Sequence, residues 1–255
     1  MCLAVVALDA HPRHALVLAA NRDEYHARPS APAAWGGDEA FRDILAGRDL
    51  MAGGTWLGVS RRGRFALVTN VREGKAQDPA ARSRGELPLH ALSGIGPVED
   101  AMRAIDLASY NGFNLLAGDA CGCAWLSNRG GSLRRIEGGV HGLSNALLDT
   151  PWPKVVRTRE RLADWLRGDA VDLEPLFAAL RDGAQPSDES LPATGVPLQW
   201  ERLLSSPFIA SERYGTRCST VLTIGRDGHA RFVERTFGPE GTTNGEVAYE
   251  FDVTA

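Results

Sequence analysis

The chain has 255 residues, of which 44% are hydrophobic and 24% charged, with a formal net charge of −4. This acidic balance, with scattered basic residues, argues against nucleic acid or an anionic membrane as the main partner. Four cysteines in a chain of this length do not make a disulfide framework, and no apolar stretch approaches the ~18–20 residues that span a bilayer. The amino terminus lacks a basic segment before its apolar run, so we expect a cytoplasmic protein with reduced thiols.

The first residues predict a hairpin. Two apolar runs, 3–8 and 15–20, flank a turn that contains Pro12. Cys2 precedes the first run, and the polar residues 21–24 follow the second. Because antiparallel partners run in opposite directions, the pattern predicts that this thiol and this polar cluster meet.

The next segment, residues 25–49, holds prolines and glycines with little periodicity, and we predict a long loop. Residues 57–59 and 64–71 then predict two short strands, which place Asn70 at a strand end. Residues 75–84 are polar and predict a loop. Apolar residues at three- and four-residue spacing predict helices within 87–92 and 98–107.

The remaining elements alternate strands, helices and strands. Strands are predicted at 113–119, 121–127 and within 132–144, helices at 155–166, 171–180 and 200–206, and strands at 216–224, 229–236 and 245–253. This order favours an α+β fold with a layered sheet core, most simply one domain over residues 1–255. In the second of these strands, the spacing of Cys121 and Cys123 puts both on one face, as small buried side chains.

Cys2 has chemistry of its own. Removal of Met1 would make it the amino-terminal residue, so that its α-amine could act as the base for its own thiol. Positive charge on Arg22 would lower the thiol pKa, and Asp23 could hold or orient the amine. The alternative is an inert, buried strand cysteine.

Other polar residues also end strands without an obvious structural role. Asn70 and Asn145 could donate hydrogen bonds to an oxyanion, and Arg217 could set the ionisation of a nucleophile. The alternatives are turn residues for the asparagines and a surface charge for Arg217.

Several short motifs occur in order and together resemble the NRDE family, also called the transport and Golgi organisation 2 family. They are Met1-Cys2, Asn21-Arg22-Asp23-Glu24 with Arg28-Pro29, Gly53-Gly54-Thr55-Trp56-Leu57-Gly58, Thr69-Asn70-Val71-Arg72, Gly142-Leu143-Ser144-Asn145 with Asp149-Thr150-Pro151-Trp152-Pro153-Lys154, and Tyr214-Gly215-Thr216-Arg217-Cys218-Ser219-Thr220-Val221. The resemblance covers residues 1 to about 235. It implies an N-terminal nucleophile hydrolase fold, a four-layer αββα sandwich of two antiparallel sheets flanked by helices.

The resemblance extends more loosely to the penicillin V acylase and bile salt hydrolase group, which cleaves linear amides with an amino-terminal cysteine. The positions that match its machinery are Cys2 as nucleophile, Arg22 and Asp23 as the early charged pair, Asn70 and Asn145 as oxyanion and amine contacts, and Arg217 as the late charge. That group has the order Arg-Asn-x-Asp at the early pair, whereas this chain has Asn21-Arg22-Asp23.

Two functions follow from the resemblance. The first is a cysteine amidohydrolase acting on non-peptide linear C–N amide bonds of a small molecule, with no cofactor and no metal. The second is a non-catalytic carrier of haem or an acyl ligand in the same cleft, which would involve Tyr25, His26 and Trp35. A scaffold with a vestigial site is a third reading.

Overall fold

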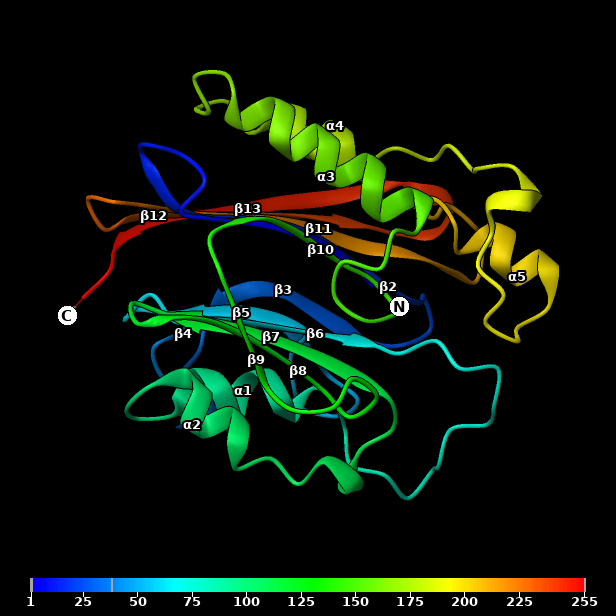
Figure 1. Ribbon diagram of the computed structural model, residues 1–255, viewed down its shortest axis with the longest axis horizontal. Helices are drawn as coiled ribbons and strands as arrows, with labels where there is room; N and C mark the ends of the chain where they lie inside the picture. The colour runs from blue at the N-terminus through cyan, green and yellow to red at the C-terminus, as the bar shows by residue number, and fades with distance from the viewer. Residues whose placement is uncertain (1, 38, 255) are drawn as a thin grey trace.

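The computed structural model describes residues 2–37 and 39–254, which form two stacked antiparallel sheets between layers of helix (Figure 1). The first sheet has the strand order β10-β1-β2-β11-β12-β13, and the second runs from β3 to β9 in sequence order. The first sheet comprises β1 (Cys2–Leu8), β2 (His14–Tyr25), β10 (Gly139–Leu143), β11 (Tyr214–Gly225), β12 (His229–Phe237) and β13 (Thr243–Asp252). The second comprises β3 (Ser30–Trp35), β4 (Ile44–Asp49), β5 (Leu57–Ser60), β6 (Phe65–Asn70), β7 (Phe113–Asp119), β8 (Gly122–Ser127) and β9 (Arg134–Ile136).

The central strands β1 and β2 are apolar on both faces because both faces are covered. Residues such as Val6 and Leu18 pack against Leu67 of the second sheet, in the core between the sheets. Their neighbours, such as Val5 and Val17, face the other way and pack against helices. Side chains alternate along a strand, so each run fills two cores at once.

The helices cover the outer faces of the sheets (Figure 1). Helices α1 (Glu86–Ser93) and α2 (Val98–Arg103) lie on the second sheet, and α3 (Pro153–Leu166) and α4 (Glu174–Leu180) lie on the first. Helix α5 (Leu198–Leu203) follows a long surface segment, and short 3-10 turns occur at Glu39–Phe41, Leu107–Ser109, Asp188–Ser190 and Pro239–Gly241. The expected four-layer αββα sandwich is confirmed.

Two local predictions are wrong. Residues 25–49 are not one loop, because they contain β3 and β4, the first two strands of the second sheet. Pro32 is tolerated in β3 because this strand lies at the sheet edge, and the pairing register breaks between Ala31 and Ala34. Cys121 does not share a face with Cys123. It is exposed in the turn before β8, whereas Cys123 is buried.

Hydrogen bonds join the two sheets at the end where β1 begins. Thr69 Oγ1 donates to the Ser144 carbonyl at 2.6 Å, and Asn145 Nδ2 donates to the Asn70 carbonyl at 2.9 Å. The Arg72 N–H also donates to the Asn145 carbonyl at 2.7 Å. These bonds hold the segment after β10 against the end of β6, and so fix the polar ends of both sheets beside Cys2.

Candidate functional site

Cys2 lies at the first position of β1, directly opposite Arg22 of β2. Directly opposed residues share a face of the sheet, and this face points between the two sheets. Cys2 is partly buried, and its carbonyl accepts a 2.9 Å hydrogen bond from Ser144 Oγ. The prediction that the thiol meets the polar cluster is therefore confirmed, because Cys2 and Arg22 are paired residues of neighbouring strands. Met1, whose removal the free-amine chemistry requires, lies outside the described residues.

A cavity of about 300 Å³ opens beside Cys2. Its walls include Arg22, Trp56, Asn70 and Arg84, which come from both sheets and from the loop before α1. This volume is at the lower end of the range for small-molecule sites. The cavity thus exposes a thiol, an asparagine amide and guanidinium groups to one small ligand.

Arg22 is buried against the second sheet. Its guanidinium lies over the Trp56 ring at 4.3 Å and 4.0 Å from Asp49 Oδ2. Within the described chain, its Nη1 atom has no hydrogen-bond partner. Arg22 therefore places a positive charge opposite Cys2 while its Nη1 remains free to donate a hydrogen bond. This charge lowers the pKa of the thiol.

The two predicted asparagines are brought together but have different environments. Asn70 lines the cavity, and its carbonyl accepts from the Asn145 side chain. Asn145 is fully buried behind it and also accepts a 3.3 Å bond from Ser144 Oγ. The Asn70 amide is thus the one that a ligand in the cavity could contact, while Asn145 holds the backbone that carries it.

Asp23 lies on the opposite face of β2 from Arg22, since successive strand residues alternate. It is buried, and its Oδ1 accepts a 2.7 Å hydrogen bond from Thr216 Oγ1. Burial raises the pKa of this carboxyl, and the positive charge of Lys154 opposes the rise. Asp23 also raises the pKa of the Cys2 thiol, as a negative charge should.

Lys154, at the start of α3, is a site residue that sequence reasoning missed. It is 1% exposed, and its Nζ has no hydrogen-bond partner among the described residues. Burial lowers its pKa to about 8, while Asp23 and Cys2 act in the opposite direction. Lys154 stands in one of the motifs that carry the family resemblance, but the motif does not show its burial. A lysine so buried indicates a functional or electrostatic role.

A buried ion pair completes this polar cluster. Arg72 Nη1 lies 2.5 Å from Glu201 Oε2, and both side chains are almost fully buried. Glu201 also accepts bonds from the Thr194 N–H and hydroxyl through its other oxygen. The positive charge of Arg72 lowers the pKa of both Asp23 and Lys154. We call Asp23, Lys154, Arg72 and Glu201 the buried charge cluster.

Burial is the largest influence on Cys2 itself, and it raises the pKa of the thiol. Arg22 and a backbone hydrogen bond from Asp23 oppose this rise, but the pKa remains above the usual value of 9.0. At neutral pH the resting sulfur is therefore a thiol, and nucleophilic attack would need a base.

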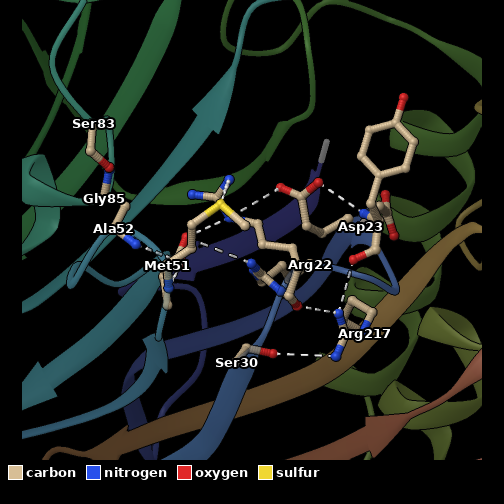
Figure 2. Close-up of polar contacts among 12 residues, drawn as sticks. Arg22, Asp23, Ser30, Met51, Ala52, Ser83, Gly85 and Arg217 are labelled. Atoms are coloured by element: carbon tan, nitrogen blue, oxygen red, sulfur yellow. Dashed lines mark hydrogen bonds and ion pairs between the residues drawn. The ribbon is translucent and has the colours of Figure 1, made fainter.

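Arg217 is not among the residues that line the Cys2 cavity in the described chain. It sits at a β-bulge between Thr216 and Cys218, where the pairing with β2 shifts register. Its Nη1 donates to the carbonyls of Tyr25 and Arg28 at 3.0 and 2.9 Å, and Figure 2 shows its guanidinium directed at Ser30. It lines a second cavity of about 320 Å³, which shares Arg22 and Trp56 with the Cys2 cavity. In this structure Arg217 therefore ties down the turn after β2.

The residues that motivated the haem carrier have other neighbours. Tyr25 packs on Tyr214, and Trp35 packs on Phe251. Neither they nor His26 are among the residues that line the Cys2 cavity in the described chain. Within that part of the chain, no three His, Cys, Asp or Glu side chains are placed to hold a metal ion. No helix there is long and apolar enough to cross a bilayer.

The fold is that of the N-terminal nucleophile hydrolases. The structure superposes on the C2A mutant of a conjugated bile acid hydrolase from Clostridium perfringens with a TM-score of 0.52, 10% identity and coverage of 99% of this chain and 92% of that one. It also superposes on an N-acylethanolamine-hydrolyzing acid amidase orthologue from Caenorhabditis elegans with a TM-score of 0.51, 10% identity and coverage of 87% and 92%. At this identity the likeness concerns the fold alone.

The chain belongs to the transport and Golgi organisation 2 family, whose sequence model matches residues 1–239. It is 34% identical to the human family homologue and 32% identical to the mouse homologue, with 98% of this chain and 99% of each relative aligned. The Drosophila melanogaster protein is 27% identical over 96% of both chains. The expected family membership is confirmed.

Proposed function

We propose that the protein is a cysteine amidohydrolase that cleaves linear, non-peptide C–N amide bonds, with Cys2 as the nucleophile. The observation that carries this proposal is the position of the thiol, at a strand end in a small cavity with the buried Arg22 and the amide of Asn70. The similarity in fold to two amide-cleaving enzymes supports it. One of those structures is a C2A mutant, so that enzyme also carries a cysteine at position 2.

The proposed reaction requires that Met1 has already been removed. The Cys2 sulfur then attacks the amide carbon, and the thiol proton passes to the free α-amine of Cys2. The carbonyl oxygen becomes an oxyanion that the Asn70 amide stabilises. Collapse breaks the C–N bond, and the leaving amine takes the proton from the α-ammonium. Water then hydrolyses the thioester, releasing the carboxylic acid and restoring the thiol. The raised pKa of Cys2 is the reason a base is required.

The test has two parts. Intact-mass measurement determines whether Met1 is removed, and N-acyl aminomethylcoumarins of increasing acyl length report amide cleavage by fluorescence. We expect a processed amino terminus and turnover that Cys2→Ala abolishes, with Cys121→Ser as the matched cysteine control. Retention of Met1, or iodoacetamide labelling of Cys2 no faster than that of exposed Cys121, would contradict the proposal.

A second candidate is carriage of an acyl ligand or haem without chemistry. The raised pKa of Cys2 favours it, because a protonated thiol is a poor nucleophile. Titration with haem, followed at the Soret band, tests the haem form. A saturable shift that His26→Ala removes would support it, and the absence of saturation would count against it.

A further inference from the structure

The Cys2 cavity is bordered by several arginines, and most of them already have a carboxylate partner. Arg22 lies near Asp49, Arg28 binds Asp49 at 2.8 Å, and Arg82 pairs with Glu86. These pairs neutralise part of the positive charge around the cavity. The remaining cavity arginine differs from all three.

Arg84 has only neutral partners. Its Nη1 donates to the Gly112 carbonyl and to Gln77 Oε1, both at 3.1 Å. Across residues 2–37 and 39–254, no carboxylate pairs with it, and its Nη2 and Nε make no hydrogen bond. Burial lowers its pKa, while the charges of Glu24 and Cys2 raise it, which places its guanidinium within the electrostatic reach of the sulfur. Glu24 acts on Arg84 through its charge without pairing with it, and a half-buried guanidinium with unpaired donors favours binding of an anion.

The backbone that carries Arg84 is firmly placed. Gly54 and Gly85 are in direct contact, so that a Cβ added to Gly54 would lie 2.4 Å from the Gly85 carbonyl carbon. The Thr55 N–H donates to the Gly85 carbonyl at 3.0 Å. Since Thr55 and Gly85 both line the cavity, this contact fixes the loop before α1 at the wall of the cavity. The guanidinium is therefore preorganised by both its main chain and its Nη1 bonds.

We propose that Arg84 is the anion-binding residue of the Cys2 cavity and that the ligand carries a carboxylate or a similar anion close to its reactive carbon. The cavity of about 300 Å³ has room for roughly ten water molecules, and both Arg84 and Cys2 line it, so one small ligand can contact both residues. Where the ligand is a substrate, this inference rests on the proposed amidohydrolase function, and it narrows the substrates to small anionic amides.

Alkylation of Cys2 provides a test that needs no substrate. Iodoacetate and iodoacetamide both form a C–S bond with the sulfur and release iodide, but only iodoacetate carries a carboxylate. The rate with iodoacetate divided by the rate with iodoacetamide is measured at Cys2 by peptide mass spectrometry at low ionic strength. Dividing this ratio by the same ratio for N-acetylcysteine gives a quotient that reports the preference of the site for the anion. We expect this quotient to be raised about tenfold, as one favourable charged contact would give.

Arg84→Gln should return the quotient to near one. A change in thiol ionisation alters both alkylation rates alike, so it cancels in the quotient. Arg82→Gln is the matched control. It removes the same charge from a position two residues before Arg84, but Arg82 is already paired with Glu86, so we expect the quotient to change about twofold at most. Thermal unfolding checks that each variant is folded. If Arg84→Gln does not fold, 1 M NaCl applied to the wild type takes its place, since screening should abolish the preference.

A wild-type quotient near one, or one that is unchanged by Arg84→Gln, overturns the inference. A raised quotient without cleavage of any amide leaves the anion site in place and counts against the proposed hydrolase. Cleavage of neutral amides together with a quotient near one supports the proposed hydrolase and overturns the anion site. The two proposals can therefore fail separately.

Discussion

The two faces of β2 at its polar end provide opposite environments for charge. On one face, Arg22 shares a cavity with Cys2 and retains an unbonded Nη1 within the described chain. On the other face, Asp23 is enclosed with Lys154, and the Arg72–Glu201 ion pair completes the buried charge cluster. Within the described chain, Asp23 also lines the Cys2 cavity, whereas Lys154, Arg72 and Glu201 do not, so the end of β2 separates an open cavity from a closed group of charges.

This difference separates reactivity from stability. A ligand or reagent in the cavity can reach the residues that line it, whereas the charges of Arg72 and Glu201 depend on the protein groups around them. Substitutions of Arg72 or Glu201 should therefore change mainly the free energy of unfolding. Substitutions on the Cys2 side should change mainly the reactivity of the thiol.

The largest effect is expected from Arg72→Met. Removing one partner of a buried ion pair leaves Glu201 uncompensated, which costs about 3–5 kcal/mol of unfolding free energy. Urea unfolding followed by circular dichroism measures this loss. The double replacement Arg72→Met with Glu201→Met should recover most of it, because no isolated buried charge remains.

The matched control for that experiment is Arg103→Met, which removes an exposed pair with Asp100 on α2. Its expected cost is below about 1 kcal/mol. Equal losses at positions 72 and 103 would show that the buried charge cluster is no more sensitive than the surface, and the contrast between the two faces would fail.

Lys154→Met should change how stability depends on pH. The pKa of Lys154 is lowered from 10.5 to about 8 in the folded protein, so between these values the unfolded chain binds more protons than the native one. The free energy of unfolding should therefore rise with pH from about 8 to 10.5 in the wild type, by up to about 1.4 kcal/mol per unit from this group. Below pH 8 the amine is protonated in both states, so Lys154 adds no pH dependence to the free energy of unfolding there.

The variant lacks the titrating amine, so its stability should rise less steeply than that of the wild type across the same window. Urea unfolding of both proteins at pH 8, 9 and 10 gives the difference directly. Parallel stability curves would mean that Lys154 titrates in the folded protein as it does in the unfolded chain.

The sequence predicted the features that depend on short-range pattern. The Cys2–Arg22 meeting follows from two apolar runs and a turn, and it is confirmed by the sheet register. Lys154 could not be found this way, because a lysine near a helix start is normally solvated and its burial depends on how α3 lies over the first sheet. Arg84, in a polar loop, is placed by a long-range contact between glycines 54 and 85. Strands β3 and β4 were missed because they are short and interrupted by proline and glycine.

On the cavity face, Arg22→Gln should slow alkylation of Cys2. Loss of the positive charge that lowers the thiol pKa should reduce the iodoacetamide rate at pH 7.5 by about three- to tenfold. The lost contact with the Trp56 ring should cost only about 1 kcal/mol of unfolding free energy. The alkylation rates of the variant and the wild type should converge above the thiol pKa, where the Cys2 thiol is fully ionised in both proteins. A pH profile of alkylation that does not move would separate Arg22 from the nucleophile.

Asn70→Ala should have the smallest effect on stability, within about 0.5 kcal/mol, because Asn70 lines the cavity and its side chain makes no hydrogen bond within the described residues. Asn145→Ala should cost about 1–3 kcal/mol, since it leaves the Asn70 carbonyl without its donor. If the Asn70 amide stabilises an oxyanion, its loss should reduce amide cleavage about 10²–10³-fold. It should not affect alkylation by iodoacetamide, because displacement of iodide builds no oxyanion. A variant that slowed both reactions equally would place Asn70 among the groups that position Cys2.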